Sequence, residues 1–261
     1  MSDSKSATET CPDLRTEFVH AGGLTFEVDM CGAGDRLAIC LHGFPEHSFS
    51  WRYQLPVLAK LGYRVWAPNL RGYGASSRPE GVANYHIDKL VEDVGLLFDA
   101  SGATELTILA HDWGAVIAWV FAIKQARPLA RLIIMNVPHP AAAAAQGRSL
   151  AQLKKSWCMF FFQIPWLPEK MLGRLAAKGV GDAIVNSSCD PEMFPDDVLD
   201  VYRNNAARPG ALTAMLNYYR ALFRFKSLRE YGHPEVANIE TPTLMIWGEE
   251  DVALVKELTF N

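Results

Sequence analysis

The stretch that decides the fold reads Leu106-Thr-Ile-Leu-Ala-His-Asp112-Trp-Gly-Ala-Val116. Its first five residues are apolar or β-branched, as in a buried strand, and the apolar run from Val116 to Ile123 is compatible with a helix. Asp112 lies between them, flanked two positions away by Ala110 and Gly114, and a strained turn from strand to helix requires such small neighbours. We interpret Asp112 as a carboxylate nucleophile raised above the carboxyl edge of a parallel sheet. The alternative is an ordinary strand end with a helix-capping aspartate.

The segments on either side alternate between strand and helix patterns. Strands are expected at 18–29 (in two pieces broken by Gly22-Gly23), 36–41, 63–67, 106–110, 131–135 and 243–247, and helices at 50–61, 87–98 and 116–123. This alternation predicts a parallel sheet with right-handed crossovers and helices on both faces. Between 141 and 238 the pattern contains helical segments and loops without a convincing strand, which indicates a helical insertion.

Composition limits the class of protein. The chain has 261 residues, of which 49% are hydrophobic, which suits one large domain with a substantial core. A formal charge of −4 gives no reason to expect nucleic acid or an anionic membrane as a partner. The five cysteines lack metal-like spacing, so most are expected to be free thiols. No leader segment is visible, and a cytoplasmic location is expected. The oligomeric state stays open between monomer and homodimer.

Three further motifs carry a family resemblance. His42-Gly-Phe-Pro-Glu46 follows a strand, Asp112 occupies the sharp turn, and Trp247-Gly-x-x-Asp251 follows the last strand-like segment after the helical insertion. In this order they resemble the α/β-hydrolase fold, and within it the epoxide hydrolases, with haloalkane dehalogenases as close relatives. The resemblance covers nearly the whole chain. It implies a mostly parallel sheet with an inserted lid: a core domain over 1–139, a helical lid over 140–238, and the second part of the core over 239–261.

The carboxylate at the turn points to alkyl transfer. A serine that attacked an epoxide would form an ether, which is a dead end, whereas a carboxylate forms an ester that water can cleave. Hydrolysis of that ester passes through an oxyanion, which needs preorganised donors. The resemblance assigns these donors to the backbone N–H groups of Phe44 and Trp113. His42 is expected to be structural.

The alkoxide that leaves carbon also needs an acid. In the family, lid tyrosines donate to the epoxide oxygen, and the motif around Tyr219 resembles the one that carries the first of them. A phenol suits this role because it stays neutral at pH 7. Many relatives have the second tyrosine where this chain has Cys158, so the two-tyrosine pair is not expected to be intact. The pocket is expected to be apolar, with Phe160 and Trp166 in its wall beside Phe44 and Trp113.

The expected catalytic base is missing from the sequence. In the family, the carboxylate at Asp251 orients a histidine that deprotonates the hydrolytic water. No histidine follows Asp251 in this chain. His111 lies beside the nucleophile on a strand, so its side chain is expected to face the opposite side. The resemblance therefore implies a truncated chain that lacks the last strand, the base and a closing helix, and that stalls at the ester.

The sequence predicts an enzyme that opens a small apolar epoxide with Asp112, Tyr219 and Asp251 as catalytic residues. Phe44, Trp113 and Cys158 are expected to contact the oxyanion or the substrate, and no metal or cofactor is needed. One alternative is a haloalkane dehalogenase that uses the same aspartate, with Trp113 holding the halide. Another is a non-catalytic protein that binds a small apolar ligand under the lid.

Overall fold

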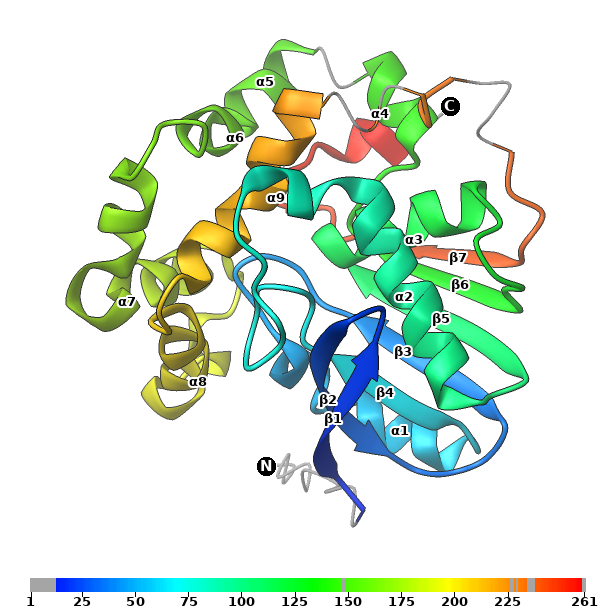
Figure 1. Cartoon of the computed structure of the whole chain (residues 1–261). Coiled ribbons are helices and arrows are strands. Elements are labelled where there is room, and N and C mark those ends of the chain that lie inside the picture. Colours follow the sequence, from blue (N-terminus) through cyan, green and yellow to red (C-terminus); the bar gives the residue numbers. More distant parts are fainter. Residues whose placement is uncertain (1–12, 147–148, 226–227, 229, 234–237, 260–261) are drawn as a thin grey trace, which may run out of the picture.

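The computed structural model describes residues 13–146, 149–225, 228, 230–233 and 238–259 (Figure 1). Seven strands form one sheet in the order β1-β2-β4-β3-β5-β6-β7. Their bounds are β1 (Arg15–Ala21), β2 (Leu24–Cys31), β3 (Arg36–Leu41), β4 (Arg64–Pro68), β5 (Glu105–His111), β6 (Arg131–Met135) and β7 (Thr243–Ile246). From β4 to β7 all neighbours pair in parallel, and the hairpin of β1 and β2 joins the sheet antiparallel. The mostly parallel sheet predicted from the sequence is confirmed.

Helices cover both faces of the sheet. The core helices are α1 (Gln54–Lys60), α2 (Ile87–Ser101) and α3 (Trp113–Ile123), with short 3-10 turns η1 (Ser48–Trp51), η2 (Val82–Tyr85) and η4 (Lys256–Thr259). The larger apolar core packs α2 and α3 against one face, and a smaller cluster around Trp51 and Leu55 covers the other. The central strands are buried on both faces, which explains why their sequences read as continuous apolar runs.

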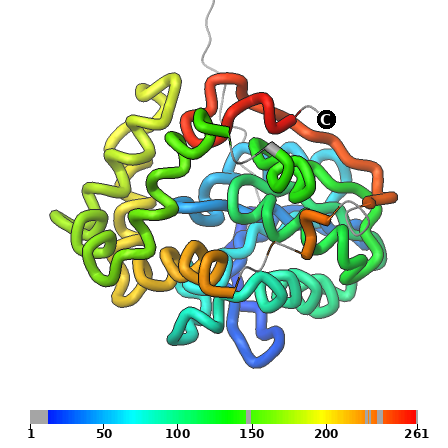
Figure 2. The backbone as a smooth tube through the Cα atoms, turned by 90° about the horizontal axis from the view of Figure 1, so that it is seen from above, coloured from blue at the N-terminus to red at the C-terminus, as the bar shows by residue number. Residues whose placement is uncertain are grey.

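The chain between β6 and β7 is helical where it is described. Its helices are α4 (Pro140–Gln146), α5 (Leu150–Lys155), α6 (Trp157–Phe161), α7 (Leu167–Ser187), α8 (Asp196–Ala206) and α9 (Ala211–Phe225), with η3 (Pro191–Met193) between α7 and α8. In two views at right angles, α7 and α8 form the side of the molecule farthest from β7 (Figure 1, Figure 2). We call this insertion the lid.

The lid is tied to the core through the loop after β4. Tyr218 of α9 donates a hydrogen bond to the carbonyl of Arg71 (2.8 Å), and the Asn205 side chain of α8 accepts one from the Gly74 N–H (2.6 Å). Arg71 is itself held by both carboxylate oxygens of Asp93 in α2. Because these groups are buried and paired, they fix where α9 lies above the sheet.

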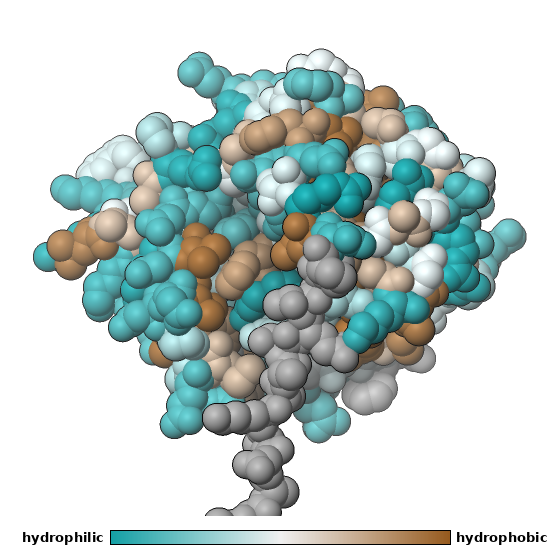
Figure 3. All heavy atoms as spheres, turned by 90° about the horizontal axis from the view of Figure 1, so that it is seen from below, coloured by the Kyte–Doolittle hydropathy of each residue, from teal (hydrophilic) through white to brown (hydrophobic). Residues whose placement is uncertain are grey.

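The surface of the molecule includes apolar residues of β7. Leu244 and Ile246 on β7 are exposed, and among the described strands only β6 pairs with β7. From below, the molecule presents mostly hydrophilic residues with smaller apolar groups between them (Figure 3).

Cys40, Cys158 and Cys189 are free thiols, whereas Cys31 is disulfide-bonded; Cys11 lies outside the described residues. In the described chain no helix is long and apolar enough to cross a membrane.

Candidate active site

The turn at Asp112 has the backbone that the sequence predicted. β5 ends at His111, α3 begins at Trp113, and Asp112 between them has φ 48° and ψ −122°. A non-glycine residue in this region is strained, and such strain persists only where the surroundings fix it. Here the O of Asp112 accepts the first helical bond from Val116, and the N–H of Gly114 is held by the carbonyl of His42 (3.0 Å).

Two glycines allow this turn to approach β3. A Cβ on Gly43 would lie 2.3 Å from the Cβ of Asp112, and a Cβ on Gly114 would lie 2.3 Å from the carbonyl oxygen of Leu41. Gly114, one of the small residues recognised in the sequence, is therefore needed because it touches the backbone of β3, and Gly43 leaves room for the Asp112 side chain. The consequence is a carboxylate held between the ends of β3 and β5.

Gly114→Ala is expected to lower the free energy of unfolding by about 3 kcal/mol, because its methyl group meets backbone that cannot move aside. Gly95→Ala is the matched control, since a methyl group at this position of α2 meets only the Arg127 side chain, the nearest atom at 3.2 Å. Urea unfolding of the two variants measures the difference. Equal stabilities would contradict the close approach.

Two backbone N–H groups bind the Asp112 carboxylate. The N–H of Phe44 donates to Oδ1 (2.7 Å), and the backbone N–H of Trp113 also hydrogen-bonds to this side chain. Burial raises the pKa of Asp112 above its ordinary value, and the charge of His111 and the two N–H groups offset part of that rise. The Phe44 N–H is therefore placed to stabilise negative charge on Oδ1.

Tyr219 lies over the same carboxylate as part of an aromatic cluster. Its ring packs edge-on against those of Phe162 (4.9 Å), Trp113 (5.0 Å) and Phe44 (5.4 Å). The Trp113 side chain hydrogen-bonds to the tyrosine, while burial and the nearby Asp112 raise its pKa well above the usual value. The phenol therefore keeps its proton at neutral pH and is available as a donor.

In the lid segment around α6, the residues that face the core differ from those expected from the sequence. Cys158 lies on the inner side, where burial raises its pKa and the charge of Asp112 adds to the effect. Phe162 is the buried aromatic residue of this segment, whereas Phe160 and Trp166 are 53% and 68% exposed. The expectation that Phe160 and Trp166 line the pocket was wrong, because sequence alone did not give the helical phase of this short segment.

Asp251 is bound at the ends of two strands. Its carboxylate accepts hydrogen bonds from Nδ2 of Asn136 and from the N–H groups of Ala253 (2.7 Å) and Leu254 (2.8 Å). Asn136 follows β6 with φ 53° and also accepts from the N–H of Gly248 (2.9 Å). The contact between Asn136 and Asp251 was not predicted from the sequence. The position of an amide residue directly after a buried strand could have indicated it.

A charged pair that sequence reasoning also missed lies beside the nucleophile. Strand alternation places His111 on the same face as Leu109, away from Ala110, as expected, and Nδ1 of His111 lies 3.3 Å from Oε2 of Glu46. Burial lowers the pKa of His111, but Glu46 and then Asp112 and Asp251 outweigh it and raise the pKa to about 9. Burial raises the pKa of Glu46, while His111 lowers it to about 2. The charge of His111 lowers the pKa of Asp112 and so offsets part of the effect of burial.

This pair predicts how stability depends on pH. The raised pKa of His111 adds stability that is complete below pH 6.5 and is lost as the pH rises through about 9. The lowered pKa of Glu46 adds stability that is complete above pH 4.5 and is lost as the pH falls through about 2. Because His111 is 39% exposed, solvent limits the loss above pH 6.5 to about 1 kcal/mol.

Glu46→Gln is expected to remove that dependence and to lower the pKa of His111, since only the burial effect and the weaker charges remain. An NMR titration of the His111 ring checks the shift, with Glu92→Gln as an exposed control. A His111 pKa unchanged in Glu46→Gln would show that the carboxylate of Glu46 does not hold the imidazolium.

His42 has a structural position. It is fully buried, its Nε2 accepts from the N–H of Leu70 (3.1 Å), and burial lowers its pKa to about 4. The neutral ring joins β3 to the loop after β4, in agreement with the role expected from the sequence.

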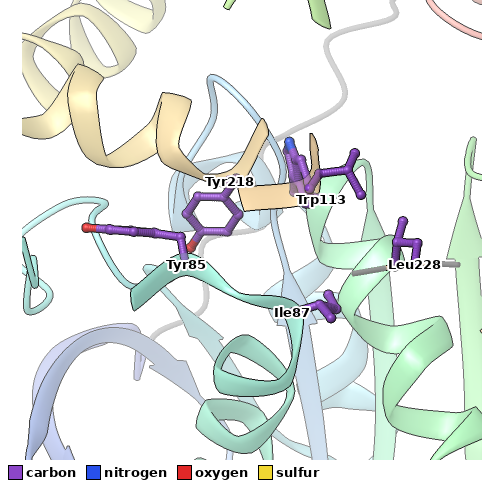
Figure 4. A pocket seen from close by; sticks show the side chains of 6 residues that line it. Tyr85, Ile87, Trp113, Tyr218 and Leu228 are labelled. Carbon is purple, nitrogen blue, oxygen red and sulfur yellow. The ribbon is translucent and has the colours of Figure 1, made fainter. Parts of the chain in front are cut away.

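A small pocket of about 10 Å³ lies behind the site (Figure 4). It is lined by Tyr85, Ile87, Trp113, Tyr218, Leu222 and Leu228. Asp112 and Tyr219 do not line it, so it is separate from the carboxylate. In the part of the chain that the structure describes, no group of three or more His, Cys, Asp or Glu residues could hold a metal ion.

Comparisons with known proteins identify the family of the chain. A family model of the alpha/beta hydrolase fold matches residues 39–256. Epoxide hydrolase A of Mycobacterium tuberculosis is 37% identical over 268 residues, covering 90% of this chain and 82% of that protein. Human epoxide hydrolase 4 is also 37% identical, over 90% of this chain, but the chain spans only 65% of its length.

A crystal structure of a Bacillus megaterium epoxide hydrolase bound to an inhibitor superposes with a TM-score of 0.82. Its sequence is 29% identical, and the match covers 94% of this chain and 87% of that one. A family match over most of the chain, relatives above 30% identity and the shared fold lead to one conclusion. The chain belongs to the α/β-hydrolase family and, within it, to the epoxide hydrolases.

Proposed function

We propose that this chain opens epoxides through a covalent ester on Asp112. Oδ2 attacks an epoxide carbon from the back, the C–O bond breaks, and its electron pair goes to the epoxide oxygen. Tyr219 gives its proton to that oxygen, which yields a hydroxyalkyl ester and a tyrosinate that recovers its proton from solvent. The observation that carries the proposal is the carboxylate itself, held at 2.7 Å by the Phe44 N–H and close enough to Tyr219 to raise the pKa of its phenol.

The second half-reaction uses the same donors. Water attacks the ester carbonyl carbon, Oδ1 becomes an oxyanion, and the N–H groups of Phe44 and Trp113 hold it. Collapse breaks the bond between Cγ and Oδ2, the proton lost by the water passes to the departing alkoxide, and the vicinal diol leaves with Oδ2 while the water oxygen completes the carboxylate. No histidine follows Asp251 in the sequence, so a base for the water is not supplied where the family places it. We propose that this 261-residue chain forms the ester faster than it hydrolyses it.

Incubation with styrene oxide tests both steps. Mass spectrometry of the intact protein is expected to show an increase equal to one substrate molecule, and diol release is expected to slow after one equivalent. Rapid diol production over many turnovers, with no adduct, would contradict the slow second step. An unmodified protein and no diol would contradict the function itself.

Dehalogenation has less support from the same residues. A halide needs N–H donors, and the Trp113 side chain hydrogen-bonds to Tyr219 instead. A phenol near the carboxylate can give a proton to a leaving alkoxide, which needs one. A leaving halide needs no proton, so the phenol favours the epoxide as substrate. Release of chloride from a haloalkane, with no reaction of styrene oxide, would reverse this preference.

Cys158→Tyr is expected to speed ester formation about tenfold, because a hydroxyl on the inner side of α6 adds a second donor to the epoxide oxygen. Cys158→Phe adds the ring without the hydroxyl and is the matched control. The rate of adduct formation by quenched mass spectrometry is the measurement. Equal rates in both variants would show that the thiol position does not reach the epoxide oxygen.

A further inference from the structure

The outer side of α5 and α6 carries an exposed apolar stripe. Five residues recur at intervals of three and four, the spacing of one helix face, and each is 42–79% exposed. We call them the lid stripe: Leu150, Leu153, Trp157, Phe160 and Ile164. Phe160 contacts the ring of Phe223 on α9 (5.5 Å), which extends the stripe onto a second helix. Large exposed apolar side chains gathered in one segment indicate an interaction site.

The same segment also faces the reaction site. Phe162, buried on its inner side, packs against Tyr219 and Phe44. α5 and α6 lie at the periphery of the molecule, outside α9 (Figure 1). Whatever binds the lid stripe is therefore one helix thickness from the nucleophile.

The charges in the segment that carries the stripe are mostly positive, whereas the loop that α5 packs against contains Glu249, Glu250 and Asp251. Residues 149–174 contain four basic side chains and one acidic side chain, although the whole chain has a formal charge of −4. That acid, Glu169, is paired with Arg220 (2.7 Å). Lys154, Lys170 and Arg174 are exposed, and within the described residues no ion pair involves them. Arg224 is exposed beside Phe223.

We propose that the lid stripe docks on an anionic lipid surface. Tryptophan, phenylalanine and leucine bordered by lysine and arginine are the composition of segments that lie in a membrane interface, where rings enter the headgroup region and cations pair with lipid phosphates. A second copy fits less well, because a two-fold contact would bring the same basic residues face to face. The net charge of the whole chain gave no reason to expect a membrane partner. That value does not reflect the excess of positive charge within residues 149–174.

Docking gives the lid a role in substrate supply. Apolar epoxides concentrate in lipid, and a docked stripe brings the segment that lines the site into contact with that reservoir. This consequence rests on the proposed function, whereas the docking itself does not depend on any chemistry.

Vesicle flotation tests the docking. The protein is expected to bind vesicles of phosphatidylcholine mixed with phosphatidylglycerol, to bind phosphatidylcholine alone at least tenfold more weakly, and to lose binding as salt is raised. Trp157→Ser with Phe160→Ser is expected to lower the partition coefficient at least tenfold. Val57→Ser with Leu61→Ser removes two exposed apolar residues, one in α1 and one directly after it, and is the matched control, which is expected to bind as the unmodified protein does.

Lys154→Glu with Arg224→Glu keeps the apolar stripe and cannot open the core, because both side chains are exposed. This variant is expected to lose its preference for phosphatidylglycerol. Failure of the unmodified protein to float with anionic vesicles would overturn the proposal, as would equal losses in the stripe and control variants. So would a concentration-dependent dimer that the stripe substitutions dissociate, since a second copy would then be the occupant. Ester formation on Asp112, followed in the same variants without vesicles, reports separately on the proposed function.

Discussion

Asp112→Asn is expected to abolish covalent labelling by styrene oxide, with the rate of adduct formation lowered by about 10⁴-fold or more. The amide has the size of the carboxylate and can still accept the Phe44 N–H through its oxygen, but it has no negative charge with which to attack carbon. Time-resolved mass spectrometry of the intact protein measures the rate.

The same variant separates an enzyme from a non-catalytic binder. Thermal unfolding near that of the unmodified protein is the control for a preserved fold. A binder would retain its affinity for a small apolar epoxide and would show no labelling before the substitution. Undiminished labelling of Asp112→Asn would place the nucleophile elsewhere.

Tyr219→Phe is expected to slow ester formation by about 10²-fold to 10⁴-fold, because the epoxide oxygen would leave as an alkoxide without a proton. The variant loses the hydrogen bond with the Trp113 side chain, but the ring contacts with Phe44, Trp113 and Phe162 involve no hydroxyl and are expected to hold the ring in place. Single-turnover labelling across a range of pH is the measurement, with the largest difference expected where the phenol is neutral.

Tyr218→Phe is the matched control for that experiment. Tyr218 is the neighbouring residue on α9, it is buried, and its hydroxyl donates to the Arg71 carbonyl rather than to the site. Its loss is expected to cost about 1 kcal/mol of stability with little change in labelling rate. If both phenylalanine variants labelled as slowly as each other, the effect would come from the position of α9 and not from an acid.

Much of the core was predictable because its elements are set by local patterns. Strand segments such as Arg36–Leu41 and Arg131–Met135 were predicted with the bounds that the structure has. The turn at Asp112 was also predictable, since small residues on either side of one polar residue are a local requirement. The close approach of Gly114 to the Leu41 carbonyl shows the physical reason for one of these small residues.

The lid was less predictable because its helices are short, and tertiary contacts decide which side of each helix faces the core. Phe160 and Phe162 are two positions apart in an aromatic run, and only the packing of Phe162 on Tyr219 decides which faces inward. Pairings such as Glu46 with His111 and Asn136 with Asp251 join residues from different strand ends. Sequence alone did not reveal such contacts, although each residue lay in or next to a motif that had been recognised.

Peptide mapping of the trapped adduct tests the central claim most directly. After brief incubation with styrene oxide and acid quenching, digestion and fragmentation are expected to place one hydroxyalkyl group on the carboxylate of Asp112. The group is expected to leave on treatment with base, as an ester does. A stable adduct on a thiol such as Cys158, or on any residue other than Asp112, would contradict the account.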